Sequence, residues 1–590
     1  MPKKKQEKNN KKKTSIKSKN FLEKLKNLVR KPDFLFVVGV VFLALLAGRY
    51  LLIPGYFNMH DDLQMMRQLA MEECFRDWQI PCRWTPHMGY GFGFPLFNYY
   101  PPLPYLVGEI FRLVGFSFVE TVKLTFLISF VLSGLTMYLW AKTFWGRLGG
   151  LLSAAFYIWA PYHSLDIFVR GAMNEAWALI WFPLILWSSY ELILKGRFRY
   201  TIILALSFTA LLTSHNLMVL IFTPLAACWV LFWLLRFKSW STIPQLAISG
   251  VWAFGLAAFF TLPVFLEQKF VHVETLVVGY YEYIAHFTTV GQLLFSRFWG
   301  YGASVWMDAD DKMSFQIGHL HWMLPIVVMG LMVWRYYKTK KVDSVLFLTT
   351  FFFAAGWFAT FMTHNKSTPI WLEFDHFLKF VQFPWRFLTL TILCFSFVVG
   401  AFPKLLNREK AKMAVFLLIG AVVGFNFGYF QPEEMGPITD QQKFTGVAWD
   451  MQQTAGIYDY LPVGANTAPK APQKELALVI SGKAVISDPV QKTNKASFKA
   501  VVESETSQIE IGIFQYPGWK VFVNGQEKEN YIGNDSWGRM HIDLIRGEYQ
   551  VVLKLENTPV RSAGNSISAV SWLLLFTAPL WRKKILTWRK

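Results

Sequence analysis

Residues 216–236 read NLMVLIFTPLAACWVLFWLLR, and their only charged residue, Arg236, stands at the very end. A helix needs about 20 predominantly apolar residues to cross the hydrocarbon core of a bilayer, so this stretch is long enough to span a membrane. Runs of the same character recur along the chain, at 34–53, 118–141, 147–163, 174–194, 199–214, 243–264, 319–336, 343–362, 381–402, 412–430 and 563–581. The pattern predicts an all-α polytopic membrane protein with about twelve transmembrane helices.

The composition agrees with a membrane location. The chain has 590 residues, of which 53% are hydrophobic and only 17% are charged, whereas a soluble globular protein carries roughly 25% charged residues. The mean hydropathy is +0.30. These values exclude a soluble enzyme, a disordered chain and a purely fibrous protein.

Positive charge is concentrated at the N-terminus. Residues 1–32 hold 13 Lys or Arg and 2 Glu, which is +11 of the formal net charge of +20. Such a tail before a first apolar helix holds the N-terminus in the cytoplasm and contacts anionic membrane lipid, so no nucleic acid is expected as a partner. Every second short connection is also basic, which predicts cytoplasmic termini in a plasma-membrane protein. The predicted outer loops are 54–117, 164–173, 265–318, 363–380 and 431–562.

Two segments depart from simple spanning helices. Residues 101–116 are apolar but short, begin with two prolines, and would invert the alternation of basic loops if they crossed the membrane. We therefore expect a re-entrant or surface helix in the outer interface. Residues 432–562 are more polar, and Asn524-Gly525 supplies the positive φ angles of a tight hairpin turn. They predict a small extracytoplasmic β-sandwich-like domain.

The chain accordingly divides into four parts. These are a basic cytoplasmic tail (1–33), a transmembrane domain (34–431) with outer loops 54–117 and 265–318, a β-rich domain (432–562), and a final helix with a basic cytoplasmic tail (563–590). Cys74 and Cys82 share the first outer loop. The sequence leaves open whether they are bridged.

The first candidate for chemistry is His60-Asp61-Asp62, just beyond the first predicted helix. Paired carboxylates beside a histidine hold a divalent cation such as Mg or Mn, or one carboxylate takes the proton of an attacking hydroxyl. The alternative interpretation is a helix end with solvated charge.

Further candidates lie in the other outer loops and at the outer ends of helices. Arg386 and Arg170 offer a planar donor fork that matches phosphate oxygens, although Arg386 also suits an interfacial anchor and Arg170 a simple ion pair with Asp166 or Glu175. His215 in a tight turn is as readily structural as functional. The remaining candidates, for binding sugar or acceptor, are Asp166, Glu175, His215, Trp299 and Tyr301.

The order of these motifs resembles the bacterial YfhO-type membrane proteins and, equally, the family labelled "6-pyruvoyl-tetrahydropterin synthase-related" membrane proteins. The resemblance rests on His60-Asp61-Asp62, Gly89-Tyr90-Gly91, Tyr99-Tyr100-Pro101-Pro102-Leu103-Pro104-Tyr105, the loop with Asp166, Arg170-Gly171-Ala172 and Glu175, Ser214-His215-Asn216, Trp299-Gly300-Tyr301-Gly302, Phe383-Pro384-Trp385-Arg386-Phe387, and Tyr458-Asp459-Tyr460-Leu461-Pro462. It implies a GT-C glycosyltransferase fold that uses a polyprenyl-phosphate sugar on the outer face of the membrane. The acidic residue that GT-C enzymes carry in their first outer loop corresponds to Asp61 or Asp62.

The resulting hypothesis is a membrane glycosyltransferase. Asp61 would act as base or metal ligand, Arg386 or Arg170 would compensate the donor phosphate, and Trp299 and Tyr301 would stack on sugar. The acceptor would be a glycan or protein of the cell envelope. The alternatives are a non-catalytic translocator or assembly factor for lipid-linked glycans, and a surface sensor that uses the β-rich domain.

Overall fold

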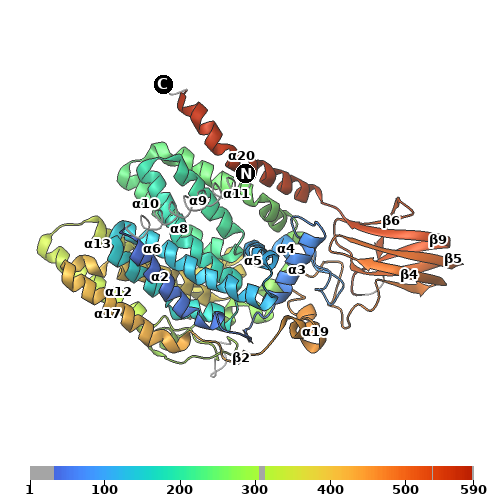
Figure 1. Cartoon of the computed structure of the whole chain (residues 1–590), viewed down its shortest axis with the longest axis horizontal. Helices are drawn as coiled ribbons and strands as arrows, with labels where there is room; N and C mark the ends of the chain where they lie inside the picture. Colours follow the sequence, from blue (N-terminus) through green and yellow to red (C-terminus); the bar gives the residue numbers. More distant parts are fainter. Residues whose placement is uncertain (1–31, 305–311, 534–535, 588–590) are drawn as a thin grey trace, which may run out of the picture.

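The computed structural model describes residues 32–304, 312–533 and 536–587, with the side chains described as far as residue 578. The basic tail at 1–31 lies outside these residues. Helices fill one end of the molecule and a twisted sheet projects from the other, with α3, α4, α5 and α19 lying between them (Figure 1).

The apolar runs of the sequence all fall on helices. In the described part of the chain, seven segments are long and apolar enough to cross a membrane: Phe118–Ile158 (α6), Met173–Lys195 (α8), Asn216–Phe237 (α10), Trp240–Leu266 (η3 and α11), Ser344–Met362 (α13), Pro384–Leu405 (η11, α16 and η12) and Arg408–Tyr429 (α17 and η13). Two shorter apolar helices are α2 (Phe34–Ala47) and α9 (Phe198–Leu212), and the remaining runs lie on α12 (His319–Thr339) and α20 (Pro559–Thr587). The prediction of a polytopic helical protein is confirmed.

The long segment α6 contains two of the predicted runs. Gly146 interrupts it with φ 77°, ψ −179°, a conformation that glycine adopts without the penalty of a Cβ. The arms fold back on each other, because a Cβ on Gly134 would lie 2.5 Å from Ile158 Cδ1. Asp33, just before α2, pairs with Lys142 (2.9 Å) and Arg147 (2.7 Å) at this turn. The start of α2 and the turn of α6 therefore share one end of the helical region.

Helix α16 (Leu388–Val399) is the centre of the helical region, since all twelve of its residues are buried. A helix that is apolar on every side belongs in a core. Its Phe397 ring stacks on Trp140 at 4.0 Å, and the Phe397 carbonyl accepts a hydrogen bond from Trp145 Nε1 at 2.9 Å. The segment just before α16 carries Arg386, so this buried helix fixes the position of that side chain.

Short helices cover the opposite end from the α6 turn. They are α3 (Gln64–Arg76), α4 (Leu96–Tyr99), α5 (Leu103–Val114), α7 (Pro161–Ser164), α14 (Thr368–Glu373), α15 (Asp375–Leu378), α18 (Asp440–Lys443) and α19 (Gly446–Thr454). Helix α5 occupies the segment expected to be re-entrant or interfacial. With twelve residues, it is too short to span a bilayer by itself.

The β-rich domain is one antiparallel sheet of seven strands in the described residues, with β3-β5-β9-β6-β7 as its main path and β4 and β8 paired to β5 and β9. The strands are β3 (Ala477–Ser481), β4 (Ala484–Gln491), β5 (Lys495–Phe514), β6 (Trp519–Val523), β7 (Gln526–Lys528), β8 (Tyr531–Ile532) and β9 (Arg539–Leu555), and a separate pair joins β1 (Tyr56–Phe57) to β2 (Met435–Gly436).

Register breaks divide the long strands β5 and β9 into two halves. Strands β4 and β6 pair with one half, whereas β3 and β8 pair with the other. Phe498 and Ile511, from the two halves of β5, join the same buried cluster, as in the predicted sandwich-like core. The predicted hairpin is confirmed, because Asn524 and Gly525 have φ 50° and 84° between paired Val523 and Gln526.

One buried ion pair joins the helices to the β-rich domain. Glu267, after α11, lies 2.8 Å from Arg561 of α20, and each side chain is only 1% exposed. Glu267 also accepts a hydrogen bond from Asn98 at 3.0 Å, and Arg561 donates to the Pro517 carbonyl at 2.9 Å. Tyr516 of the β-rich domain hydrogen-bonds to Asn98 as well, at 3.1 Å. Four distant segments therefore meet at this pair.

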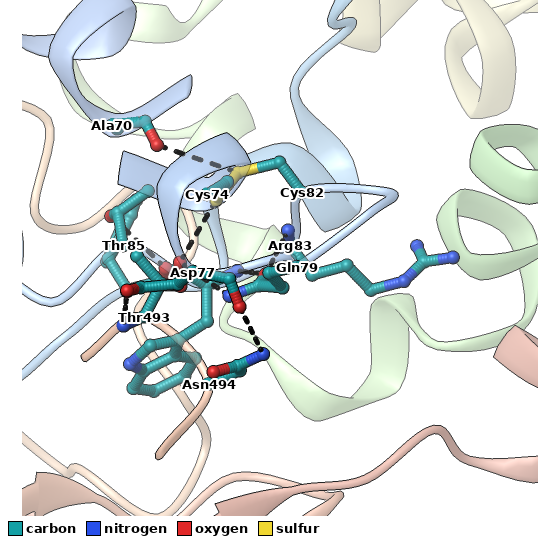
Figure 2. Close-up of a disulfide and its surroundings, with 11 residues drawn as sticks. Ala70, Cys74, Asp77, Gln79, Cys82, Arg83, Thr85, Thr493 and Asn494 are labelled. Atoms are coloured by element: carbon teal, nitrogen blue, oxygen red, sulfur yellow. Dashed lines mark hydrogen bonds between the residues drawn. A yellow bond between two sulfur atoms is a disulfide. The ribbon is translucent and has the colours of Figure 1, made fainter. Parts of the chain in front are cut away.

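A second contact between the first outer loop and the β-rich domain lies next to a disulfide. Cys74 and Cys82 are bonded, which answers the question that the sequence left open. The loop between them carries Asp77, whose carboxylate accepts from the Thr493 backbone N–H at 2.8 Å and whose carbonyl accepts from Asn494 Nδ2 at 3.3 Å. Figure 2 shows both contacts beside the sulfur atoms.

We expect Glu267→Gln to lower the free energy of unfolding by about 3–5 kcal/mol, because Arg561 would remain buried without a counter-charge. The matched control is Glu527→Gln, which removes an exposed pair with Lys520 at 3.1 Å and should cost at most about 1 kcal/mol. Thermal unfolding in detergent measures both. The double variant Glu267→Gln/Arg561→Gln should lose less free energy of unfolding than the two single variants lose together. Additive losses would contradict a direct pairing.

Candidate functional site

A cavity of about 960 Å³ opens where the first outer loop and α19 cover the ends of the helices. Its volume is in the upper part of the range of small-molecule sites, about 300–1,000 Å³. Its lining includes most of the residues that the sequence singled out, namely His60, Asp61, Asp62, Arg170, Glu175, His215 and Arg386.

Backbone hydrogen bonds fix the His60-Asp61 segment. The His60 N–H donates to the Val169 carbonyl at 3.0 Å, and the Asp61 N–H donates to the Arg170 carbonyl at 2.9 Å. The His60 ring bonds to the Tyr301 carbonyl through Nε2 at 2.7 Å, and burial lowers the pKa of His60 below its usual value. The three predicted outer loops 54–117, 164–173 and 265–318 are therefore tied together.

The two carboxylates of the pair have different surroundings. Asp61 Oδ2 accepts hydrogen bonds from Arg67 Nη1 at 2.6 Å and Gln64 Nε2 at 3.1 Å, whereas no described residue donates to Oδ1. The Asp61 side chain remains 34% exposed. Asp62 pairs with Lys443 through Oδ2, while its Oδ1 is buried without a partner in the described part of the chain. Burial raises the pKa of Asp62 despite the nearby lysine.

Glu175 organises the arginines of the cavity. Its Oε2 lies 2.9 Å from Arg170 Nη2 and 3.4 Å from Arg386 Nε, and its Oε1 accepts from the Tyr162 hydroxyl at 2.6 Å. The contact with Arg386 has ion-pair distance but not the geometry of a hydrogen bond. Arg170 is more fully engaged, because Nη1 also pairs with Asp166.

Arg386 retains an unused donor. Its Nη1 donates to the Val381 carbonyl at 2.8 Å and to Gln382 Oε1 at 2.9 Å. Among the described residues, nothing accepts a hydrogen bond from Nη2. The guanidinium packs 4.9 Å from the Phe383 ring. Backbone and amide contacts thus hold Arg386 beside the cavity with donor capacity left for a ligand.

Some candidates lie away from the cavity, or their side chains make contacts within the protein. Asp166 is fully buried behind Arg170, the Trp299 ring stacks on Tyr429 at 4.8 Å, and the Tyr301 hydroxyl donates to the Gln431 carbonyl at 2.9 Å. These three are absent from the lining. His215 does line the cavity, and its Nδ1 caps α10 by accepting from the Leu217 N–H at 3.2 Å.

A divalent cation at Asp61 and Asp62 stays a prediction. Across the residues that the structure describes, no group of three or more His, Cys, Asp or Glu side chains is placed to hold a metal ion. Asp61 and Asp62 instead have Arg67 and Lys443 as counter-charges.

The structure adds a carboxylate to which the sequence assigned no role. Asp459 lines the cavity, and burial raises its pKa from an ordinary value of 3.8 to about 7, with Arg67 opposing and Asp61 reinforcing the shift. Its carboxylate accepts no hydrogen bond from a described residue. The sequence feature that points to this carboxylate is the Tyr458-Asp459-Tyr460 motif, an acid between aromatic residues. The burial of Asp459, however, depends on contacts with the first outer loop.

No family model matches the chain. An uncharacterized protein of Lactococcus lactis subsp. cremoris (strain MG1363) is 20% identical over 333 residues, which are 53% of this chain and 51% of that protein. The chain thus matches about half the length of this curated relative.

Among solved structures, the chain is similar to the crystal structure of the Archaeoglobus fulgidus oligosaccharyltransferase tethered with an acceptor peptide containing the NVT sequon. The match covers 73% of this chain and 63% of that one, at 12% identity and a TM-score of 0.35. The resemblance to YfhO-type proteins remains a prediction, and the interpretation of the site rests on its geometry.

We expect Asp459→Asn to stabilise the protein at pH 8 but not at pH 4. Between pH about 4 and 7 the folded state keeps a proton on Asp459 that the unfolded chain releases, so wild-type stability falls as pH rises through this window. Asparagine cannot ionise and avoids that loss. Melting curves at the two pH values test this, with Asp450→Asn on exposed α19 as control. An equal effect at both pH values would contradict the elevated pKa.

Proposed function

We propose that the chain is a GT-C-type membrane glycosyltransferase that moves a sugar from a polyprenyl-phosphate-linked donor to a cell-envelope acceptor. The cavity of about 960 Å³ is the proposed active site. One observation carries the proposal: Asp61 and Arg386 line one cavity at the end of apolar helices, and each has an atom without a hydrogen-bond partner among the described residues, Asp61 Oδ1 and Arg386 Nη2. A base and a phosphate-binding cation are the two groups that the proposed reaction uses.

In the proposed reaction an acceptor hydroxyl attacks the anomeric carbon of the donor sugar. The bond between that carbon and the phosphate oxygen breaks, and the phosphate leaves with the electron pair. Asp61 takes the hydroxyl proton, and Arg386 compensates the charge of the leaving phosphate. Arg67 keeps Asp61 in place through the other carboxylate oxygen, so the base is oriented before the substrate binds.

Asp459 is a second candidate base, because its carboxylate has no hydrogen-bond partner in the described residues and its pKa is about 7. A base whose pKa is near the working pH is well matched to proton transfer. If Asp459 took the proton, the rate would rise with pH through about 7, and Asp459→Asn would remove that dependence.

The outer face of the membrane is the proposed location of the cavity. Disulfides persist in oxidising compartments outside the cytoplasm, and Cys74–Cys82 lies in the first outer loop beside the cavity. The basic turn at Lys142 and Arg147 belongs to the other end of the helical region, with Asp33. Both features agree with the alternation of basic loops.

We expect Asp61→Asn to lower the transfer rate by about 10²–10⁴-fold, as loss of a general base does. Mass spectrometry of lipid-linked sugars and surface glycans would compare cells lacking the gene with cells complemented by wild type, Asp61→Asn or the exposed control Asp488→Asn. The Asp61→Asn strain and the strain lacking the gene should accumulate the same unused donor. Full glycan transfer by a folded Asp61→Asn protein would contradict Asp61 as the base, and full transfer that also survives Asp459→Asn would support a translocator or assembly factor.

We expect Arg386→Lys to raise the KM for the donor by about tenfold or more, since a lysine lacks the second donor of the fork. Donor titrations in proteoliposomes, beside thermal unfolding curves, separate donor binding from stability. Arg297→Lys is the matched control, because Arg297 contacts the Phe425 carbonyl at 3.2 Å and does not line the cavity. Equal donor KM values in the Arg386 variant and wild type would reduce Arg386 to an interfacial anchor.

A further inference from the structure

A second cavity, of about 450 Å³, lies between the first outer loop, α19 and the edge of the β-rich domain. It shares no lining residue with the larger cavity. Its volume is also within the range of small-molecule sites, about 300–1,000 Å³. Neither the sequence motifs nor the proposed transfer reaction accounts for it.

Aromatic rings form one part of this cavity. The His87 and Trp449 rings lie with their centroids 5.2 Å apart, and Tyr90 lines the same space. Tyr90 has φ 59°, a left-handed conformation that costs a bulky residue energy. Backbone hydrogen bonds hold it there, because its N–H donates to the Gln453 carbonyl and its carbonyl accepts from the Gln473 N–H, each at 3.0 Å. These bonds fix the backbone of Tyr90 beside the cavity.

Unsatisfied oxygen atoms form the other part. Glu73 bonds to His87 through Oε1 at 2.8 Å, but its Oε2 is buried with no partner among the described residues. Thr493 Oγ1 is also buried without a hydrogen-bond partner among the described residues. Buried polar oxygens without partners are rare in folded proteins and are commonly completed by water or a ligand. Both residues line the cavity.

The charges of this cavity disfavour a phosphate or other anion. Its charged lining residues are Glu73, Asp77 and Asp450 against Arg76 and Lys492. The two cations already have partners, since Arg76 pairs with Glu72 and Lys492 lies 3.4 Å from Asp77. What remains available is a set of acceptors and aromatic faces.

From these observations we infer that the second cavity binds a neutral glycan. Sugar rings present apolar C–H faces that pack on aromatic side chains and hydroxyl groups that donate to carboxylate and hydroxyl oxygens. Trp449 and Tyr90 line the cavity with aromatic rings, and Glu73, Asp450 and Thr493 line it with acceptor groups. This binding does not require that the protein transfer a sugar.

Helix α19 places the glycan next to the larger cavity. Trp449, Asp450 and Gln453 line the second cavity, whereas Ala448, Met451 and Gln452 line the first. Opposite faces of one nine-residue helix thus form a common wall. If the proposed function holds, a glycan held here is the distal part of the acceptor, and this last step rests on that function.

The test is direct binding by the full chain in nanodiscs, without any donor. Maltotriose, cellotriose and chitotriose are the probes, and saturation-transfer NMR with titration gives the affinities. We expect at least one trisaccharide to bind, Trp449→Ala to weaken it about tenfold, and Glu73→Gln to weaken it as well. Trp449→Phe should retain most of the affinity because it keeps an aromatic face. Trp78→Ala is the matched control, since Trp78 is 84% exposed and lines neither cavity.

Absence of binding by all three trisaccharides to the wild-type protein would overturn the inference. So would binding that Trp449→Ala and Glu73→Gln leave unchanged, provided that melting curves show both variants folded. Loss of affinity in Trp78→Ala equal to that in Trp449→Ala would also contradict a site in this cavity. Because the assay contains no donor and measures no transfer, failure of the proposed enzymatic activity would leave its result unaffected.

Discussion

The Glu267–Arg561 ion pair is the contact on which the arrangement of the two parts of this protein depends. Removing both charges from water is costly, and the pair is stable only because further hydrogen bonds satisfy the remaining donors and acceptors. Asn98 and the Pro517 carbonyl provide them. The same contacts that satisfy the ion pair therefore dock the first outer loop and the β-rich domain against α11 and α20. Without that docking the larger cavity would lose its cover, because Tyr99 and Tyr100 in its wall adjoin Asn98.

Within the larger cavity, charge is balanced almost completely by the protein itself. Four acidic and four basic side chains line it, the acidic ones being Asp61, Asp62, Glu175 and Asp459 and the basic ones Arg67, Arg170, Arg386 and Lys443. Most of them pair with one another. Such pairing limits the energetic cost of holding charges near a membrane. It also leaves few groups open for chemistry, and this is why one oxygen of Asp61 and one nitrogen of Arg386 carry so much of the functional argument.

The sequence predicted what depends on local patterns. Apolar runs such as 216–236 located the helices, Asn524-Gly525 located a hairpin, and positive-inside alternation grouped Asp61, Glu175 and Arg386 at one end, where the structure does bring them together. It missed what depends on tertiary burial. Glu267 and Arg561 are 294 residues apart, and the pKa of Asp459 is set by what covers it. Trp299, predicted to stack on sugar, stacks on Tyr429 of η13 and does not line the larger cavity.

Helix α19 shows how a short element can link two sites. At nine residues it would be marginal alone, so its position depends on its neighbours. Gln452 Nε2 donates to the Lys443 carbonyl at 2.6 Å, and Lys443 pairs with Asp62 in the larger cavity. On the opposite face, Gln453 holds the backbone of Tyr90 in the second cavity. The contacts made by the two sides of α19 therefore meet in one short element, which is a wall of both cavities and is held by the cavity residues on each side.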